Sequence, residues 1–177
     1  MKKRLRIEYF LVAAVMLLLF VGSIAATNFF FQKEMVAQQE TYLRRKNTLL
    51  TDQLPPSVFE KGQLTNQQQL LVTHALDDAE ERVTLLQKNG TVFFDSSQNE
   101  PLESHKKRPE IAAVLSGATY GSALRKSKTL NKELLYVATP VLKSGEIVGI
   151  IRISEQTALF SKNIQSFRRY IIFTFGI

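Results

Sequence analysis

The hydrophobic pattern of the chain is dominated by one uncharged apolar run over residues 9–31, YFLVAAVMLLLFVGSIAATNFFF. A helix needs roughly 20 such residues to cross a bilayer core about 30 Å thick, so the run predicts a transmembrane helix. Basic residues precede it at Lys2, Lys3, Arg4 and Arg6. Because basic flanks stay on the cytoplasmic side of a span, we expect residues 1–8 to be a cytoplasmic tail and the chain after the run to be extracytoplasmic.

A cleaved signal peptide is the alternative interpretation of this run. Ser23-Ile24-Ala25 offers the small-x-small pattern that signal peptidase prefers. Secretory apolar segments usually span about 7–15 residues, however, whereas this one continues through Phe31. Length therefore favours an uncleaved anchor in the plasma membrane.

A second apolar stretch begins at the other end of the chain, at Tyr170. About eight apolar residues cannot cross a bilayer, so we expect residues 168–177 to be the truncated start of a second transmembrane helix. The alternative is a short C-terminal helix folded onto the preceding domain. Residues 32–167 are then predicted to be one extracytoplasmic domain tethered to the membrane at both ends.

Residues 32–54 are expected to form a helix that continues out of the membrane, because apolar pairs recur at a spacing of seven among polar residues. Pro55-Pro56 ends the helix, since proline lacks an amide donor and restricts its predecessor. The stripe packs either on the helix's own domain or on a second copy in a homodimer, and the pattern leaves both open. Its members are Met35/Val36, Tyr42/Leu43, Leu49/Leu50 and Leu54.

The rest of the domain predicts an α+β fold, in which an antiparallel sheet of about five strands is flanked by helices. Helices are expected from a Thr65 cap to about Asp77, over Pro109–Leu115, and after a Ser154 cap. Asn-Gly at 89–90 predicts a hairpin between the first two strands, because both residues tolerate positive φ. The last two strands are apolar enough to be central, covered on both faces with helices on one side. The predicted strands are 82–87, 91–95, 119–124, 133–141 and 147–153.

Composition removes several classes of function. The chain carries a net charge of +7, but residues 32–167 hold 17 Lys/Arg against 15 Asp/Glu, which leaves only +2 for the domain. Nucleic-acid binding is therefore not expected, and the basic ends instead suit the lipid bilayer. There is no cysteine, which excludes disulfides and thiolate catalysis, and the two histidines, His74 and His105, lie far apart. No metal site is predicted.

Four segments carry a family resemblance: ERVTLLQKNGTVFFDSS, SHKKRPEIAAVLSG, LNKELLYVATPV and GEIVGIIRIS. Together they resemble the extracytoplasmic sensor domain of phosphate-regulon-type sensor histidine kinases of Gram-positive bacteria. The resemblance implies a single-Cache or PAS-like fold, a dimeric two-component sensor and a cytoplasmic response regulator as partner. It also implies a kinase domain that uses ATP. These 177 residues hold no histidine box and no phosphate-cradling glycine loop, so no catalytic residue or cofactor is predicted within them.

One anion-binding site is predicted, from Arg108, Lys126, Tyr136 and Arg152. Arg108 precedes a short helix whose N-terminus favours anions, and Lys126 belongs to a second basic group. Arg152 interrupts an apolar strand, so it lies either at a sheet edge or buried and paired. Tyr136 is expected to reach the same face. The alternative is that these charges only solvate the surface.

The function predicted from these features is the input region of a membrane-bound sensor histidine kinase. A helix shift of a few ångströms would carry the signal across the membrane. The alternatives are the sensor region of a chemoreceptor or nucleotide cyclase, or a non-enzymatic envelope interaction protein. The reading frame after Ile177 discriminates between them, because a histidine box there supports the kinase.

Overall fold

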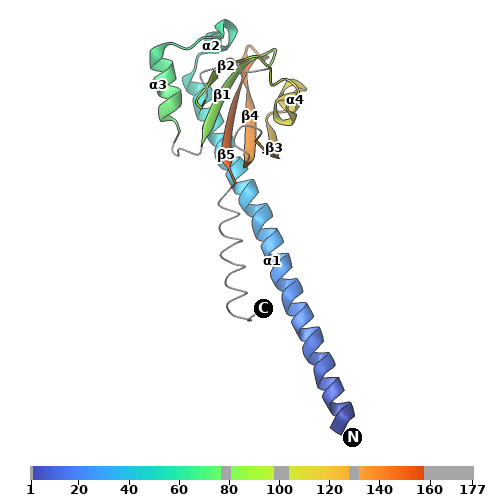
Figure 1. The fold of residues 1–177 in the computed structure, drawn as a ribbon. Coiled ribbons are helices and arrows are strands. Elements are labelled where there is room, and N and C mark those ends of the chain that lie inside the picture. Colours follow the sequence, from blue (N-terminus) through green and yellow to red (C-terminus); the bar gives the residue numbers. More distant parts are fainter. Residues whose placement is uncertain (1, 77–80, 98–103, 128–131, 158–177) are drawn as a thin grey trace. The chain divides into compact units, whose positions relative to one another are not determined.

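The computed structural model describes residues 2–76, 81–97, 104–127 and 132–157 (Figure 1). The chain divides into two compact units, Met1–Gln38 and Gln39–Ile177. The predicted second span, residues 168–177, lies outside the described residues. So does the final helix that was expected after Ser154.

The first unit is formed by the greater part of helix α1 (Lys2–Gln53), a single uninterrupted helix that contains the whole apolar run. Within the described part of the chain, α1 is the one helix that is long and apolar enough to cross a membrane. Most large apolar side chains of the run are exposed and not packed against protein; Phe10, for example, is 73 % exposed and Leu18 is 74 % exposed. A membrane-spanning segment has this property, because lipid rather than protein covers it.

The last turns of α1 belong to the second unit and carry a buried stripe. Leu43, Asn47, Leu50 and Leu54 follow one another at helical spacing and are at most 2 % exposed. Leu49 points outward at 60 % exposure, and Tyr42 is 41 % exposed although its hydroxyl donates to Glu81 at 3.2 Å. Packing on the helix's own domain is therefore confirmed for the inner member of each of these pairs, while a homodimer seam stays a prediction for the outer members.

The second unit is built on a five-stranded, fully antiparallel sheet in the order β2-β1-β5-β4-β3. The predicted sheet is confirmed, and the two most apolar strands are central as expected. β5 runs through Gln156, so Ser154 is a buried strand residue and not the helix cap that the sequence suggested. The strands are β1 (Arg82–Gln87), β2 (Val92–Asp95), β3 (Gly121–Lys126), β4 (Glu133–Lys143) and β5 (Glu146–Gln156).

Two tight turns set the register of the sheet. The predicted hairpin joins β1 to β2, with Gly90 at φ +86° and the Asn89 side chain accepting a 2.9 Å hydrogen bond from the amide of Thr91. Positive φ at two consecutive turn residues occurs instead between β4 and β5, at Ser144 (52°) and Gly145 (84°). That pattern fits the right-handed twist of a two-residue hairpin.

Three short helices accompany the sheet: α2 (Pro56–Lys61), α3 (Asn66–His74) and α4 (Pro109–Leu115). The predicted Thr65 cap is confirmed, because its hydroxyl accepts from the Gln68 amide while the Gln68 side chain accepts from the Thr65 amide. α4 has the predicted bounds. α2 was not predicted, since it begins at Pro56, within the Pro55-Pro56 break, and is only six residues long.

Helices cover both faces of the sheet, whereas the sequence predicted them on one. Alternate residues of a strand point to opposite faces. At Gly149 of β5 an added Cβ would clash with the Phe59 ring of α2, while Arg152 of the same strand contacts Glu110 of α4. The last turns of α1 lie on the Phe59 side, where Asn47 donates to the Val137 carbonyl of β4 (Figure 1). We call these two surfaces the α1 face and the α4 face.

Candidate functional site

The α4 face divides into an apolar half and a polar half. The apolar half is a closed cluster between α4 and the hairpin ends of the strands, in which each core member is fully buried. Because alternate strand positions share a face, the next positions along β1 and β5 bring Thr84 and Arg152 into the polar half. The apolar core residues are Leu86, Ile111, Val114, Ala138 and Ile150.

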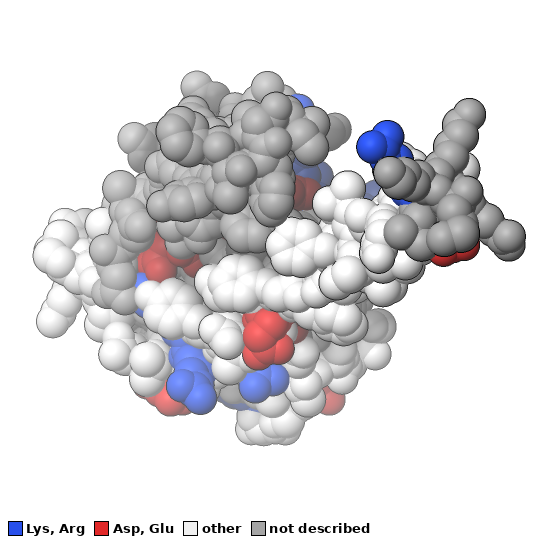
Figure 2. Space-filling model, turned by 90° about the horizontal axis from the view of Figure 1, so that it is seen from below, with Lys and Arg blue, Asp and Glu red and all other residues white. Residues whose placement is uncertain are grey.

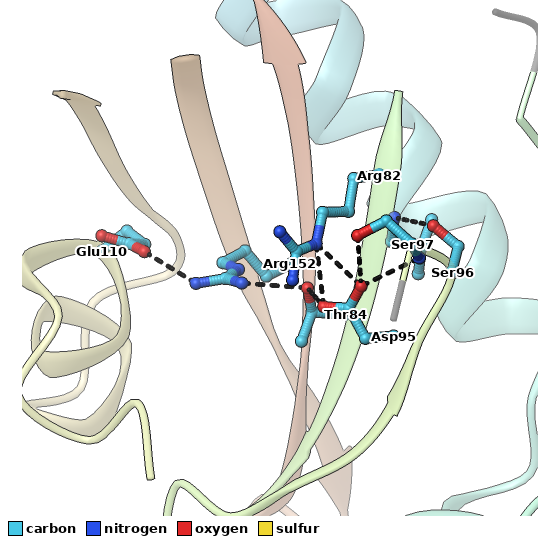
Figure 3. Close-up of polar contacts among 8 residues, drawn as sticks. Arg82, Thr84, Asp95, Ser96, Ser97, Glu110 and Arg152 are labelled. Carbon is cyan, nitrogen blue, oxygen red and sulfur yellow. Dashed lines mark hydrogen bonds and ion pairs between the residues drawn. The ribbon is translucent and has the colours of Figure 1, made fainter. Parts of the chain in front are cut away.

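Arg152 is the centre of the polar half and is only 2 % exposed. One guanidinium nitrogen donates to Glu110 Oε1 of α4 at 3.3 Å, and the other donates to Thr84 Oγ1 of β1 at 2.9 Å (Figure 3). Burial lowers the pKa of Arg152 to about 10, although the Glu110 carboxylate opposes that shift. The residue therefore remains a cation at neutral pH, held in place by two neighbouring elements.

The network continues from Thr84 to a buried ion pair. The Thr84 hydroxyl donates to Asp95 Oδ2 at 2.9 Å, and Arg82 Nε donates to both oxygens of Asp95 at 2.7 and 2.9 Å (Figure 3). Burial raises the pKa of Asp95, but the hydrogen bonds from Arg82, the Ser97 amide and Thr84 outweigh it, and the net pKa lies below 3.8. Five side chains on four elements thus form one continuous polar network.

A second arginine completes the site on the other side of Glu110. Arg125 of β3 donates to the same Oε1 at 3.0 Å. The ring of Tyr136 lies against both arginines, with its centroid 3.7 Å from the Arg125 guanidinium carbon and 5.1 Å from that of Arg152. Such stacking stabilises a desolvated cation, so Tyr136 helps to keep two guanidinium groups at one carboxylate.

Two of the four predicted anion-site residues meet here. Tyr136 and Arg152 share the α4 face, as the sequence analysis expected. Lys126 is exposed and follows Arg125 directly in β3, so strand alternation places it on the opposite face. Arg108 is half-buried at the N-cap of α4. Anion binding itself stays a prediction.

His105 lies close to this network and is 8 % exposed. Burial and the charges of Arg152, Arg108 and Arg82 lower its pKa to about 4, with Asp95 acting in the opposite direction. Its Nδ1 atom is buried and has no hydrogen-bond partner among the described residues. The imidazole is therefore neutral at physiological pH and is held next to cations.

Most of the network was not predicted from the sequence. Glu110, at the second position of α4, reads as an ordinary first-turn acid that favours the helix N-terminus. Arg82 and Asp95 stand at strand ends, where charged residues are usually solvated. The one signal that was available is the run of polar residues at every second position of β1, Arg82 and Thr84, which strand periodicity places on the face of Arg152.

The face of the molecule drawn in Figure 2 shows no dominant charge among the described residues. In the view of Figure 2, basic and acidic side chains lie next to each other and no broad patch of one sign is visible. Elsewhere on the surface of the described residues, Lys143 and Glu60 pair at 2.7 Å. Among the described residues, no three histidine, aspartate or glutamate side chains gather so as to hold a metal ion.

Comparison with known proteins gives one family match. The model of the Single Cache-like family matches residues 52–156, which is more than half of the chain. No curated protein sequence matches.

Solved structures of similar fold include three sensor or receptor proteins. The sensor domain of the Vibrio cholerae histidine kinase DctB matches with a TM-score of 0.60 at 18 % identity, over 75 % of this chain and 54 % of that one. An extracellular ligand-binding receptor from Desulfohalobium retbaense gives 0.57 at 10 % identity, over 74 % of this chain and 25 % of that one. The ligand-binding domain of the Campylobacter jejuni chemoreceptor Tlp3, in complex with 4-methylisoleucine, gives 0.54 at 13 % identity, over 72 % and 54 %.

These structural matches show the fold. The chain spans about half the length of the DctB and Tlp3 domains and a quarter of the Desulfohalobium receptor.

Proposed function

Because the chain belongs to the single Cache-like family, whose domains are extracytoplasmic sensors, we propose that it is the input region of a membrane-bound sensor histidine kinase. The observation that carries the proposal is helix α1. One uninterrupted helix contains both the apolar run of a membrane anchor and the buried stripe of the Cache domain. A sensor domain that shares a helix with its anchor has a direct mechanical route to the membrane.

The contacts of α1 support a mechanism for the transfer. Gln39 Nε2 donates to Glu155 Oε2 at 2.7 Å, and Lys46 pairs with Glu81 at 2.6 Å. These contacts join α1 to the end of β5 and to the start of β1, the two strands that carry Arg152 and Thr84 on the α4 face. A change at the α4 face would therefore bias the position of the sheet against α1, and two packings of these elements would be the two signalling states.

The narrower assignments remain proposals. The phosphate-regulon type rests on the four sequence segments, and the comparisons lend it no support. A chemoreceptor input domain is the second candidate function, because the structural matches include the sensory domain of Tlp3. A kinase core, its ATP and a response regulator belong to this proposal and would lie outside these 177 residues.

Membrane topology is the first test, and the absence of cysteine makes the chain a clean background for it. Single cysteines at the exposed positions Lys107 and Ser122 should react with a membrane-impermeant maleimide on intact cells. A cysteine at Lys3 should react only after the cells are opened. Labelling of Lys3→Cys on intact cells, or protection of both domain cysteines, would contradict the topology.

The output is the second test. The protein is expressed from the complete reading frame, including whatever is encoded after Ile177, and membranes that contain it are incubated with γ-labelled ATP. Acid-labile phosphohistidine on that protein is expected, and Arg152→Met should change the rate at which it forms. If no phosphohistidine forms and the reading frame continues into a chemoreceptor signalling helix, the second candidate function would be established instead.

A further inference from the structure

Glu110 is a carboxylate in an unusual position. It is 0 % exposed, and its side chain accepts hydrogen bonds from two guanidinium groups on strands of the sheet, Arg125 at 3.0 Å and Arg152 at 3.3 Å. The Tyr136 ring lies against both cations. Two cations and an aromatic face arranged around one oxygen atom have the composition of a site for an oxyanion.

We propose that Glu110 is a built-in occupant of an anion site, and that a ligand carboxylate or phosphate group binds by taking its place. This inference rests on the proposed sensor function and concerns the regulation of the same site. In the structure the chain's own carboxylate fills the site, so the domain is in its self-occupied state. Displacement of Glu110 is the event that the sensor reports.

The geometry makes Glu110 a replaceable occupant. Both arginines bind the same oxygen, Oε1, while Oε2 is buried and has no hydrogen-bond partner among the described residues. The Nε atoms of Arg125 and Arg152 also lack partners there. Guanidinium groups bind carboxylates and phosphates best through two parallel hydrogen bonds. A free anion can turn to engage these donors, whereas the carboxylate of Glu110 is fixed by its backbone.

The charges of the described residues agree with this. The polar half of the α4 face holds three cations, Arg82, Arg125 and Arg152, against two carboxylates, Asp95 and Glu110. Asp95 is engaged by Arg82, so Glu110 alone stands against two arginines. Its release would leave buried Arg152 and partly buried Arg125 without a counter-charge, a state that is unfavourable without an anionic replacement.

Displacement would also move α4. A Cβ atom added at Gly121 of β3 would clash with the backbone carbonyl of Glu110, so the helix backbone contacts the strand at this residue. The first turn of α4 is thus held by that contact and by the two ion pairs together. When the ion pairs exchange to a ligand, α4 loses its polar attachment to β3 and β5.

The test is chemical rescue of Glu110→Ala in the full 177-residue chain in lipid nanodiscs. We expect the Tm to fall by about 10 °C, because two buried cations lose their partner. Sodium acetate or inorganic phosphate at about 100 mM should then raise the Tm of the variant by about 4–8 °C, while chloride at equal ionic strength does not. Wild type, with the site filled, should show no anion-specific shift.

Controls separate the site from general effects of salt. Ile111→Ala removes a fully buried neighbour on the same helix without touching an ion pair, and acetate should not restore its Tm. Glu110→Ala/Arg152→Ala should also lose the rescue. Glu110→Gln, which keeps the side-chain volume, replaces the alanine variant if that does not fold, and anion binding to it is then measured by calorimetry.

Rescue by acetate alone would assign a carboxylate ligand, and rescue by phosphate alone a phosphoryl ligand. Rescue by neither anion, or an equal shift in wild type and Ile111→Ala, would overturn the inference. In that case the maleimide and phosphohistidine experiments could still succeed, and the sensor role would stand without this site. Rescue together with failed topology labelling would keep the anion site and remove the sensor role.

Discussion

The two faces of the sheet are held by different physical means. On the α1 face, Leu43, Leu50, Leu54 and Phe59 are at most 2 % exposed, and Asn47 is the one polar residue of the α1 stripe. On the α4 face, a charged network from Arg82 to Glu110 replaces half of the apolar contact. The first face is attached by burial, which is non-directional and contributes about 1.5–3 kcal/mol per large side chain. The α4 face depends in addition on hydrogen bonds and ion pairs, which form only when their partners lie at the right distance and angle.

This difference separates anchoring from switching. Buried apolar contacts have no partners to exchange, so on the α1 face we expect only a small shift of the packed helix against the sheet. A buried ion pair gains little net stability over apolar packing, but its partners can be exchanged. In the proposed sensor, the exchangeable contacts would lie on the face opposite to α1, and β1 and β5 would join the two faces.

The largest expected effect is on the α1 face. Leu43→Glu places an unpaired carboxylate at a site with 0 % exposure, and we expect it to lower the free energy of unfolding by about 4 kcal/mol or more. Because Leu43 packs on its own domain, this substitution reports folding and not self-association. Leu43→Ala serves as the apolar control and should cost about 2–5 kcal/mol. Urea unfolding of the chain in nanodiscs measures both, and near-wild-type stability of Leu43→Glu would show that the stripe is not a core.

Breaking the charged network should cost less. Arg152→Met removes a cation from two partners and leaves Thr84 and one side of Glu110 without a donor. We expect a loss of about 3 kcal/mol in the free energy of unfolding. Arg125→Met is the matched control on the same carboxylate, and its larger side-chain exposure of 22 % against 3 % predicts a loss of only about 1 kcal/mol. Equal losses at the two sites would indicate that burial does not set the energy of these pairs.

The parts of the fold that periodicity determines were predictable. Local chemistry, which acts within a few residues of sequence, accounts for the five strands, the Gly90 hairpin, the Thr65 cap and α4. The predicted helix cap at Ser154 was wrong. A serine before an acidic residue is typical of a helix cap, but the same residue also suits a strand position opposite Tyr136. Helix α2 was not predicted because a helix of one and a half turns has too little hydrophobic periodicity to be distinguished from a loop.

The site was predictable only in part, for a different reason. Ion pairs join residues far apart in sequence, as Glu110 and Arg152 are, so spacing does not reveal them. Strand alternation could have shown that Arg125 and Lys126 face opposite ways, but not which of them faces α4. Arg152 was found because a charge in an apolar strand must lie at an edge or be buried and paired, and Tyr136 because it was expected to reach the same face.

A smaller effect comes from the pH dependence of the α4 face. His105 has a folded pKa of about 4, below its ordinary 6.5, so the unfolded chain binds a proton that the folded chain does not. Stability is therefore expected to fall as the pH drops below about 6.5, by about 1–2 kcal/mol at pH 5. Asp95 stays ionised in this window because its pKa lies below 3.8.

The substitution His105→Gln should flatten this stability profile between pH 7 and pH 5. The exposed His74 is the matched control, and His74→Gln should leave the profile as in wild type. Thermal unfolding at a series of pH values measures both variants. A slope that His105→Gln does not change would mean that another group on the α4 face takes up the proton.

The smallest effect on stability is expected at the outer side of α1. Leu49 is 60 % exposed, so Leu49→Glu should change the free energy of unfolding by no more than about 0.5 kcal/mol. Leu49 and Tyr42 are seven residues apart on one helix face, which is the spacing of a two-helix seam. If two copies pair through this face, the added charge weakens self-association in nanodiscs or detergent without unfolding the domain. Leu142→Glu, at the similarly exposed end of β4, is the control. If the sedimentation of Leu49→Glu matches that of wild type, the outer side of α1 does not pair two copies. The inner side, with Leu43, already packs on its own domain.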